Sequence, residues 1–284
     1  MGWLALLLHG VLIAGMALAL AGVLARARAG RRGEAPPHVG QAWRDLVRLW
    51  RKGGTAPAGA SFVFGAAPAV AVGSAGAAAL LVPSFTVGMA TAGMEDVVVV
   101  AGLLGLSRAA VALAAHDAGS AVAVFGGGRM MLARLGATPV VLLVAMALVM
   151  LSGGTNLDAA ALAVRDGGAL ARVAGGLAGL AVLAAGQEPA WPMAAFGGRQ
   201  RALLELAGHL RLVAVVSLTV AVGLPFGLGS GPEGWAVGLA CWTLKVGVVG
   251  LVAVATGRPG AVVLRGAALL AVAAVMLAVV QGRA

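Results

Sequence analysis

Five ionisable side chains stand within or at the ends of long apolar stretches, where the chemistry open to them is proton exchange. Arg108 and Lys245 lie inside such stretches, and Asp117, Glu188 and Glu205 lie at their ends. A charge inside a membrane costs at least about 2.5 kcal/mol unless it is paired or hydrated, so it marks a functional site by default. Burial brings the pKa values of carboxyl groups and amines closer to neutral pH, where protons can be exchanged. The five residues are therefore our candidates for a proton path.

Plainer structural roles exist for some of these residues. Glu205 follows Arg201 by four residues and can pair with it along one helix face, and Asp117 can cap or anchor a helix end. Arg108 and Asp117 are nine residues apart, about 13 Å along a helix, which is too far for a direct pair. Lys245 stands near the middle of its apolar stretch, so we expect it to face the bundle interior, a water-filled cavity or a partner subunit.

Eight apolar stretches must position these side chains, and each is long enough to cross a hydrocarbon core of about 30 Å as a helix. The chain is 61% hydrophobic and only 11% charged, and its polar segments leave no room for a soluble domain. The fold class predicted is an all-α polytopic membrane protein, with residues 1–284 as a single integral membrane domain. The predicted spans are about 3–25, 62–82, 97–115, 135–151, 169–186, 207–226, 234–255 and 261–280.

Basic residues are distributed unevenly between the two sides of such a bundle. Of the 20 Lys and Arg residues, fifteen fall on the loops after the first, third, fifth and seventh spans, and three fall on the opposite side. Basic loops stay in the cytoplasm, so we expect a multi-pass protein of the inner membrane with both termini outside. The net charge of +10 then reflects topology and not nucleic-acid binding. The fifteen are Arg26, Arg28, Arg31, Arg32, Arg44, Arg48, Arg51, Lys52, Arg129, Arg134, Arg199, Arg201, Arg211, Arg258 and Arg265; the three are Arg165, Arg172 and Arg283.

The first basic loop contains one amphipathic segment, residues 41–52. Its apolar residues recur at helical spacing on one face, and its arginines recur on the opposite face. Such a helix is typical of a membrane interface, where it is either a lipid anchor or also a docking surface for a cytoplasmic partner. The apolar face holds Trp43, Leu46, Val47 and Trp50, and the basic face holds Arg44, Arg48 and Arg51. Our partner-docking candidates are Arg44, Arg48, Arg129 and Arg201, all expected on loops of this side.

Metal and nucleotide sites are not expected in this chain. The single Cys241 cannot form an internal disulfide or a cysteine-based metal site, and the four histidines show no ligand spacing. The run Gly126–Gly128 lacks the Lys-Ser/Thr that follows a phosphate loop, and no strand precedes it. We expect these glycines to let the backbone bend sharply between two spans.

Four segments, in order along the chain, resemble one family of eight-span membrane subunits. That family is shared by respiratory complex I, as NADH dehydrogenase subunit 1, and by group 4 membrane-bound hydrogenases, including formate hydrogenlyase subunit 4. The segments are Gln41-Ala-Trp-Arg-Asp-Leu-Val-Arg-Leu-Trp-Arg-Lys52; Arg108 followed by Asp117-x-Gly119-Ser120 and Phe125-Gly-Gly-Gly-Arg129-Met130; Arg199-x-x-Ala202-Leu-Leu-Glu205-Leu206 leading to Arg211 and Ser217-Leu218; and Lys245 in the seventh span.

The resemblance implies a non-catalytic membrane anchor that binds no cofactor by itself. In the family, this subunit joins a peripheral arm on the cytoplasmic side, with iron–sulfur clusters and a large catalytic subunit, to antiporter-like membrane subunits. It also begins a path of charged residues toward ion translocation. Quinone-reducing members shape a quinone cavity at the interface with the arm.

Several acidic features of the family are absent here. Thr138-Pro139 stands where the family has Glu-Pro, Met130 follows Arg129 directly, and the acidic loop and the acid late in the seventh span are missing. The losses favour a hydrogenase-like or more divergent anchor and coupling subunit over the quinone-site subunit of a complex I-type NADH dehydrogenase. A stand-alone secondary transporter remains a third reading, although residues 1–142 and 143–284 show no convincing repeat of the kind that transporters often carry.

Overall fold

The computed structural model describes residues 2–54, 56–187, 196–229, 231–255 and 261–282. Within these ranges, eight helices are long and apolar enough to cross a membrane, which confirms the predicted number of spans and the all-α class. The spanning helices are α1 (Gly2–Arg31), α3 (Phe62–Leu80), α4 (Val97–Asp117), α5 (Ala121–Ser152), α7 (Ala169–Gly186), α8 (Gly198–Gly223), α9 (Trp235–Ala255) and α10 (Ala261–Gln281). The shorter elements are α2 (Gln41–Arg51), α6 (Leu157–Asp166) and the 3₁₀ turns η1 (Ala92–Met94) and η3 (Pro232–Gly234).

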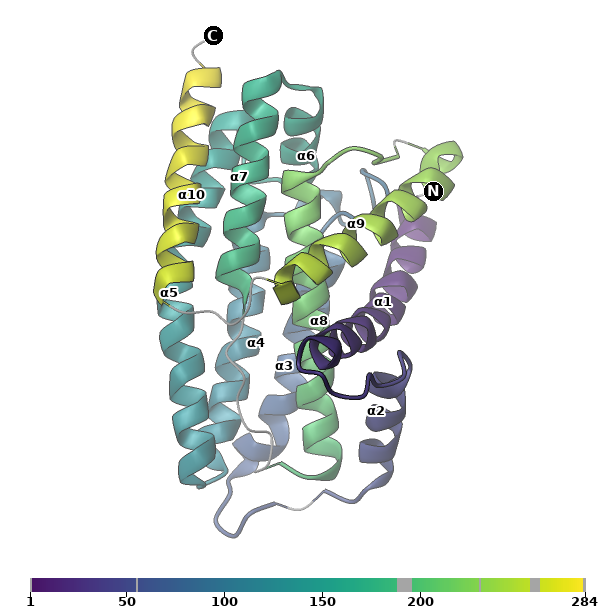
Figure 1. Ribbon diagram of the computed structural model, residues 1–284, viewed down its shortest axis with the longest axis vertical. Coiled ribbons are helices and arrows are strands. Elements are labelled where there is room, and N and C mark those ends of the chain that lie inside the picture. Colours follow the sequence, from purple (N-terminus) through teal and green to yellow (C-terminus); the bar gives the residue numbers. More distant parts are fainter. Residues whose placement is uncertain (1, 55, 188–195, 230, 256–260, 283–284) are drawn as a thin grey trace.

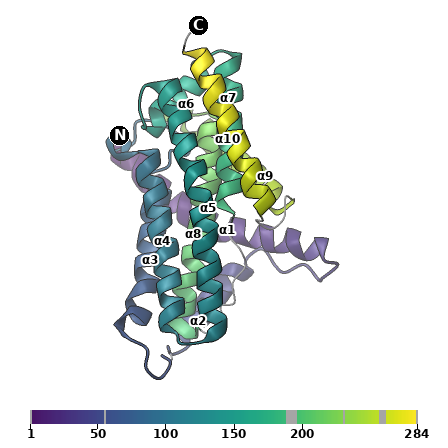
Figure 2. The same ribbon diagram turned by 90° about the vertical axis from the view of Figure 1, so that its left-hand side faces the viewer.

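The spanning helices differ in direction and reach (Figure 1). Helices α3, α4, α5 and α8 extend to the lower end of the bundle, whereas α7 and α10 occupy only the half that carries the C-terminus. Helices α1 and α9 are strongly inclined, and Figure 2 shows part of α1 running almost across the long axis. Helix α2 packs against α1 and the lower part of α8. The lower part of the bundle is therefore built by fewer helices than the upper part.

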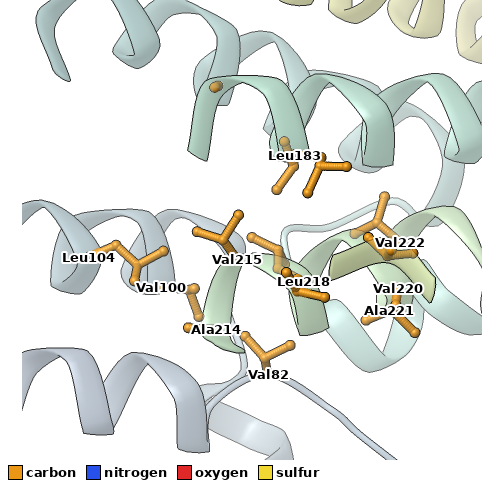
Figure 3. Packing of buried hydrophobic residues seen from close by; sticks show 14 of the residues in the cluster. Val82, Val100, Leu104, Leu183, Ala214, Val215, Leu218, Val220, Ala221 and Val222 are labelled. Atoms are coloured by element: carbon orange, nitrogen blue, oxygen red, sulfur yellow. The ribbon is translucent and has the colours of Figure 1, made fainter. Parts of the chain in front are cut away.

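Helix α8 forms the centre of the core. Its residues from Val213 to Val222 are all buried and pack against α3, α4 and α7, and Figure 3 shows Val215 and Leu218 lying between Leu104 of α4 and Leu183 of α7. Small residues let the helices approach closely.

The contact between α7 and α8 contains a glycine pair. A Cβ added to Gly179 would lie 2.9 Å from the Cα of Gly223, so the backbones of the two helices touch there. Position 179 has no room for a larger residue unless the helices move apart, whereas a Cβ at Gly223 would lie 3.4 Å from the Cα of Gly179, an ordinary van der Waals contact.

The expected bend at Gly126–Gly128 is wrong, because these residues lie inside α5. The turn comes earlier, at Gly119 with φ +64°, and Ser120 then caps α5 by accepting a hydrogen bond from the amide of Ala123. The glycines instead allow close packing on α4: a Cβ at Gly127 would lie 3.2 Å from that of Ala115. Helix α5 thus begins well before the predicted span.

Most of the arginines assigned to loops belong to helices, and three of them lie well inside a spanning helix. Arg129 lies in α5 and stays exposed, Arg134 lies further along α5 and is half-buried, and Arg211 lies in α8 with only 2% of its surface exposed. Segments rich in glycine and arginine look like loops in the sequence. Here such segments form the first turns of α5 and α8, which are longer than the predicted spans. Helix α6 was not predicted, because its ten residues are too short for a span.

Candidate functional site

One end of the bundle carries several exposed basic residues, and we call it the arginine-rich end. It consists of α2, residues 118–120 between α4 and α5, and the first turns of α5 and α8, at the bottom of Figure 1. Arg44, Arg48 and Arg129 are exposed there, and Arg201 is partly exposed. The structure therefore brings all four predicted docking residues to the same end.

Helix α2 is confirmed as a helix, and one side of it packs against α1 and α8. Leu49 is buried, whereas Trp43 and Trp50 are 60% and 53% exposed. A surface cavity of about 450 Å³ lies along the exposed side of α2. It is lined by two apolar residues and four basic ones: Trp43, Val47, Arg44, Arg48, Arg51 and Lys52. Arg48 also pairs with Asp45 at 2.9 Å. This surface offers apolar contact and positive charge side by side.

Two of the predicted proton-path acids have structural partners at this end. Asp117 Oδ2 accepts hydrogen bonds from the Ser61 amide at 3.0 Å, the Ser61 hydroxyl at 3.0 Å and the Phe64 amide at 2.8 Å. It therefore ties the end of α4 to the start of α3. Glu205 pairs with Arg201 at 2.8 Å along α8. Both geometries match the plainer roles that the sequence allowed.

Arg108 and Arg211 are cations enclosed by the bundle. Arg108 is 9% exposed and donates to the carbonyl of Gly186, the last residue of α7, at 3.3 Å. A cation suits a helix C-terminus because the terminal carbonyls carry partial negative charge. Arg211 donates to the hydroxyl of Ser107 at 3.0 Å, and that hydroxyl donates to the carbonyl of Ala71 at 2.7 Å. Together they join α3, α4, α7 and α8.

Lys245 caps the far end of α8. Its Nζ donates to the carbonyls of Leu224 at 2.8 Å and Phe226 at 2.6 Å, and it lies 4.6 Å from the centre of the Phe226 ring. Only 6% of the residue is exposed. The predicted position inside the bundle is confirmed, and the structure adds a capping role that the sequence did not indicate.

A buried pair of carboxyl groups, Glu95 and Asp158, lies at the end opposite the arginine-rich end. Glu95 is fully buried and Asp158 is 8% exposed. Glu95 Oε1 accepts from the hydroxyl of Thr91 at 2.9 Å, and Asp158 Oδ2 accepts from the amide of Gly88 at 2.7 Å. The other two oxygens, Glu95 Oε2 and Asp158 Oδ1, find no donor among the described groups while both carboxyls are ionised.

A proton held between the two carboxyl groups would supply the donor that Glu95 Oε2 and Asp158 Oδ1 lack. Burial, together with the neighbouring charge of Asp158, raises the pKa of Glu95 from 4.5 to about 8, and burial also raises the pKa of Asp158. Among the described residues, neither carboxyl has an ion pair or a hydrogen bond with a cation. Near neutral pH the pair therefore holds a proton, which joins the α3–α4 loop to α6.

The described proton-path candidates do not share one site. Arg108 contacts the end of α7, Asp117 and Glu205 lie at the arginine-rich end, and Lys245 lies at the far end of α8. Glu188 lies outside the described residues. Sequence reasoning missed Glu95 and Asp158, which look like ordinary loop and helix-start acids, and it placed Arg134 and Arg211 in loops.

Three similarities to known proteins agree with this architecture. The sequence profile of a family described as NADH dehydrogenase matches residues 3–186. Hydrogenase-4 component C of Escherichia coli (strain K12) is 28% identical over 221 residues, which are 72% of this chain and 70% of that protein. A chain of the membrane-bound sulfane sulfur reductase, an archaeal respiratory membrane complex, has a TM-score of 0.75 and 20% identity, covering 98% of this chain and 99% of its own. The last likeness shows the fold alone.

The matched residues make up well over half of the 284-residue chain, and the same stretch contains α1 to α7 and the amphipathic helix. The chain therefore belongs to the NADH dehydrogenase family of membrane subunits, of the complex I subunit 1 type.

Proposed function

We propose that this family member is the membrane-anchor and coupling subunit of a multi-subunit, energy-converting redox complex of the hydrogenase and complex I kind. Its arginine-rich end docks a peripheral arm that carries the iron–sulfur clusters and the large catalytic subunit. One observation carries the proposal. The four docking candidates lie at the same end of the bundle as Trp43 and Trp50, two exposed aromatic side chains on α2. Exposed aromatic and arginine side chains are enriched where protein interfaces form.

The coupling part of the proposal concerns the interior charges. Arg108, Asp117, Glu188, Glu205 and Lys245 are the ionisable groups proposed to carry the effect of electron transfer from the arm toward antiporter-like membrane subunits. Family membership supports a role in such a complex, and the burial of Arg108 and Lys245 inside an apolar bundle supports a functional use for their charge.

Charge reversal on α2 tests the docking surface. In the complex purified from native membranes, the double substitution Arg44→Glu and Arg48→Glu is expected to lower the amount of co-purified peripheral subunits more than tenfold. Like charges placed across an interface cost several kcal/mol, which is enough for such a loss. This chain should remain inserted, because α2 lies outside the spanning helices. Quantitative mass spectrometry of the purified material measures both amounts.

Arg32→Glu provides the matched control, since Arg32 is an exposed basic residue on the same predicted side but outside α2. It should leave the peripheral subunits bound. Retention of the arm in the double variant would mean that the basic face of α2 anchors lipid only, and docking by α2 would be abandoned.

The proposed orientation places the arginine-rich end in the cytoplasm of an inner-membrane protein, with both termini outside, because of the 15-to-3 distribution of basic residues. Single cysteines introduced at Glu34 and Glu233, in a Cys241→Ala background, are expected to react with an impermeant thiol reagent from opposite sides of oriented vesicles. Both residues lie outside the predicted spans and are exposed. Reaction of both from one side would overturn the topology.

A further inference from the structure

A slit between α4 and α5 opens onto the outer surface of the bundle. Its cavity has a volume of about 210 Å³ and is walled almost entirely by apolar side chains of α4 and α5, with α7 and α8 behind it. Val98 and Leu142, at its edge, are 48% and 59% exposed, so the slit faces the surroundings of the spanning helices. Val215 and Leu218 of α8 also line it.

Two guanidinium groups stand at one end of this apolar slit. Arg108 of α4 and Arg134 of α5 both line it and also line a small adjoining cavity that reaches Gln187. Arg134 is tucked into the slit over Gly105: a Cβ at that glycine would lie less than 2 Å from the guanidinium nitrogens. Glycine at position 105 therefore makes the space that the cation occupies. Within the described part of the chain, the Arg134 guanidinium makes no hydrogen bond and no ion pair.

The depth of these cations is set by α7. That helix has 18 residues, so it is about 27 Å long and just spans a hydrocarbon core. Its last residue, Gly186, accepts the hydrogen bond from Arg108 and also lines the slit. The cations thus lie where α7 reaches the membrane boundary on the arginine-rich side, at the level of lipid headgroups. From there the slit follows α4 to Val98, ten residues or about 15 Å into the apolar layer.

We infer that the α4–α5 slit is a binding site for an anionic phospholipid. One acyl chain lies along the apolar walls, and the phosphate of the headgroup faces Arg134 with Arg108 behind it. A chain-like apolar tail fits a slit between two helices that are joined by only three residues, Ala118–Ser120, and cannot separate at that end. The positive charge selects a lipid with a net negative headgroup, since basic pockets at the cytoplasmic side of helix bundles recognise such headgroups.

The test uses the complex purified from native membranes and reconstituted into nanodiscs of phosphatidylcholine and phosphatidylglycerol in equal parts. Bound lipid is then measured by native mass spectrometry. Arg134→Gln is expected to lower phosphatidylglycerol retention about fivefold, the effect of one basic residue near an anionic headgroup. Gly102→Leu is expected to lower it as well, because position 102 lines the slit with no atom within 4 Å of an added Cβ. This second variant keeps both arginines.

Arg129→Gln is the matched control, since Arg129 lies on the same helix, is exposed and does not line the slit. It should retain phosphatidylglycerol like the unaltered complex, and glycerol phosphate added in excess should not displace the lipid if the tail is bound. Equal retention of phosphatidylglycerol in all variants, or retention of phosphatidylcholine equal to that of phosphatidylglycerol, would overturn the site.

Two other results would also overturn the proposal. Displacement by glycerol phosphate would show a phosphate site without a tail. A cross-link from Gly102→Cys to another subunit would show that a protein fills the slit.

Discussion

Replacing Glu95 by Gln is expected to make the end opposite the arginine-rich end insensitive to pH. In the unaltered chain the pKa of Glu95 is raised from 4.5 to about 8, so the folded form holds the proton more tightly than the unfolded form. The stability due to this proton is complete below about pH 4.5 and is lost as the pH rises toward 8. A single proton changes the opening equilibrium by at most tenfold per pH unit. In the variant, the introduced glutamine amide can donate to Asp158 at every pH.

Hydrogen exchange of the segments 85–97 and 153–166, corrected for the intrinsic pH dependence, measures this opening between pH 5 and pH 9. These segments are joined by hydrogen bonds from the Leu157 amide to the Glu95 carbonyl at 2.7 Å and from the Val97 amide to the Thr155 carbonyl at 3.0 Å. Asp166→Asn is the control, because that carboxylate is exposed and pairs with Arg165. Parallel pH slopes for Glu95→Gln and the unaltered chain would rule out the shared proton.

Replacing Lys245 by Met is expected to have two separable effects. It removes two hydrogen bonds from a charged donor to the carbonyls of Leu224 and Phe226, each of which contributes about 1.5–3 kcal/mol. The thermal unfolding temperature of the chain should therefore fall. If Lys245 also belongs to the proposed coupling path, the assembled complex should build little or no ion gradient for each electron transferred, while reduction of a soluble dye by the peripheral arm continues.

The ratio of gradient to electron transfer separates the two roles. A cap alone would lower both activities in proportion to the amount of assembled complex, and Lys245 would then leave the proposed path. Thr243→Val tests whether any polar loss on α9 has the same effect, because the Thr243 hydroxyl bonds only to the Leu239 carbonyl of its own helix, at 2.8 Å. That control should leave the ratio unchanged.

Hydropathy was sufficient to predict the number of spans, and it placed one of them, α7, at residues 169–186 as the structure has it. A membrane core requires about 20 apolar residues, and that requirement is strong and local. Hydropathy could not locate the start of α5, since Gly126–Gly128 and Arg129 extend a helix past the apolar part. It also carries no information on the inclination of α1 and α9, which depends on packing against α8.

The partners of the buried ionisable residues could not be predicted from the sequence. Lys245 could be predicted to face inward because an isolated charge in lipid is costly. The carbonyls that it contacts lie 19 and 21 residues away, in a loop whose path the sequence does not specify. Glu95 is adjacent to Asp96 and looks like part of a solvated acidic loop, while its partner comes 63 residues later at the start of α6. Only the folded chain brings those two carboxyls together.

The backbone contact between α7 and α8 has a consequence for how this sequence can change over time. A Cβ at Gly179 would lie 2.9 Å from both the Gly223 Cα and the Thr219 carbonyl oxygen, so a larger residue there must push two central helices apart. By contrast, a Cβ added to Gly15, Gly65 or Gly73 would meet no atom within 4 Å. Glycines in such open helical positions can be replaced by alanine without a clash. Gly179, by contrast, is required by the close approach of α7 to α8, independent of the base composition of the gene.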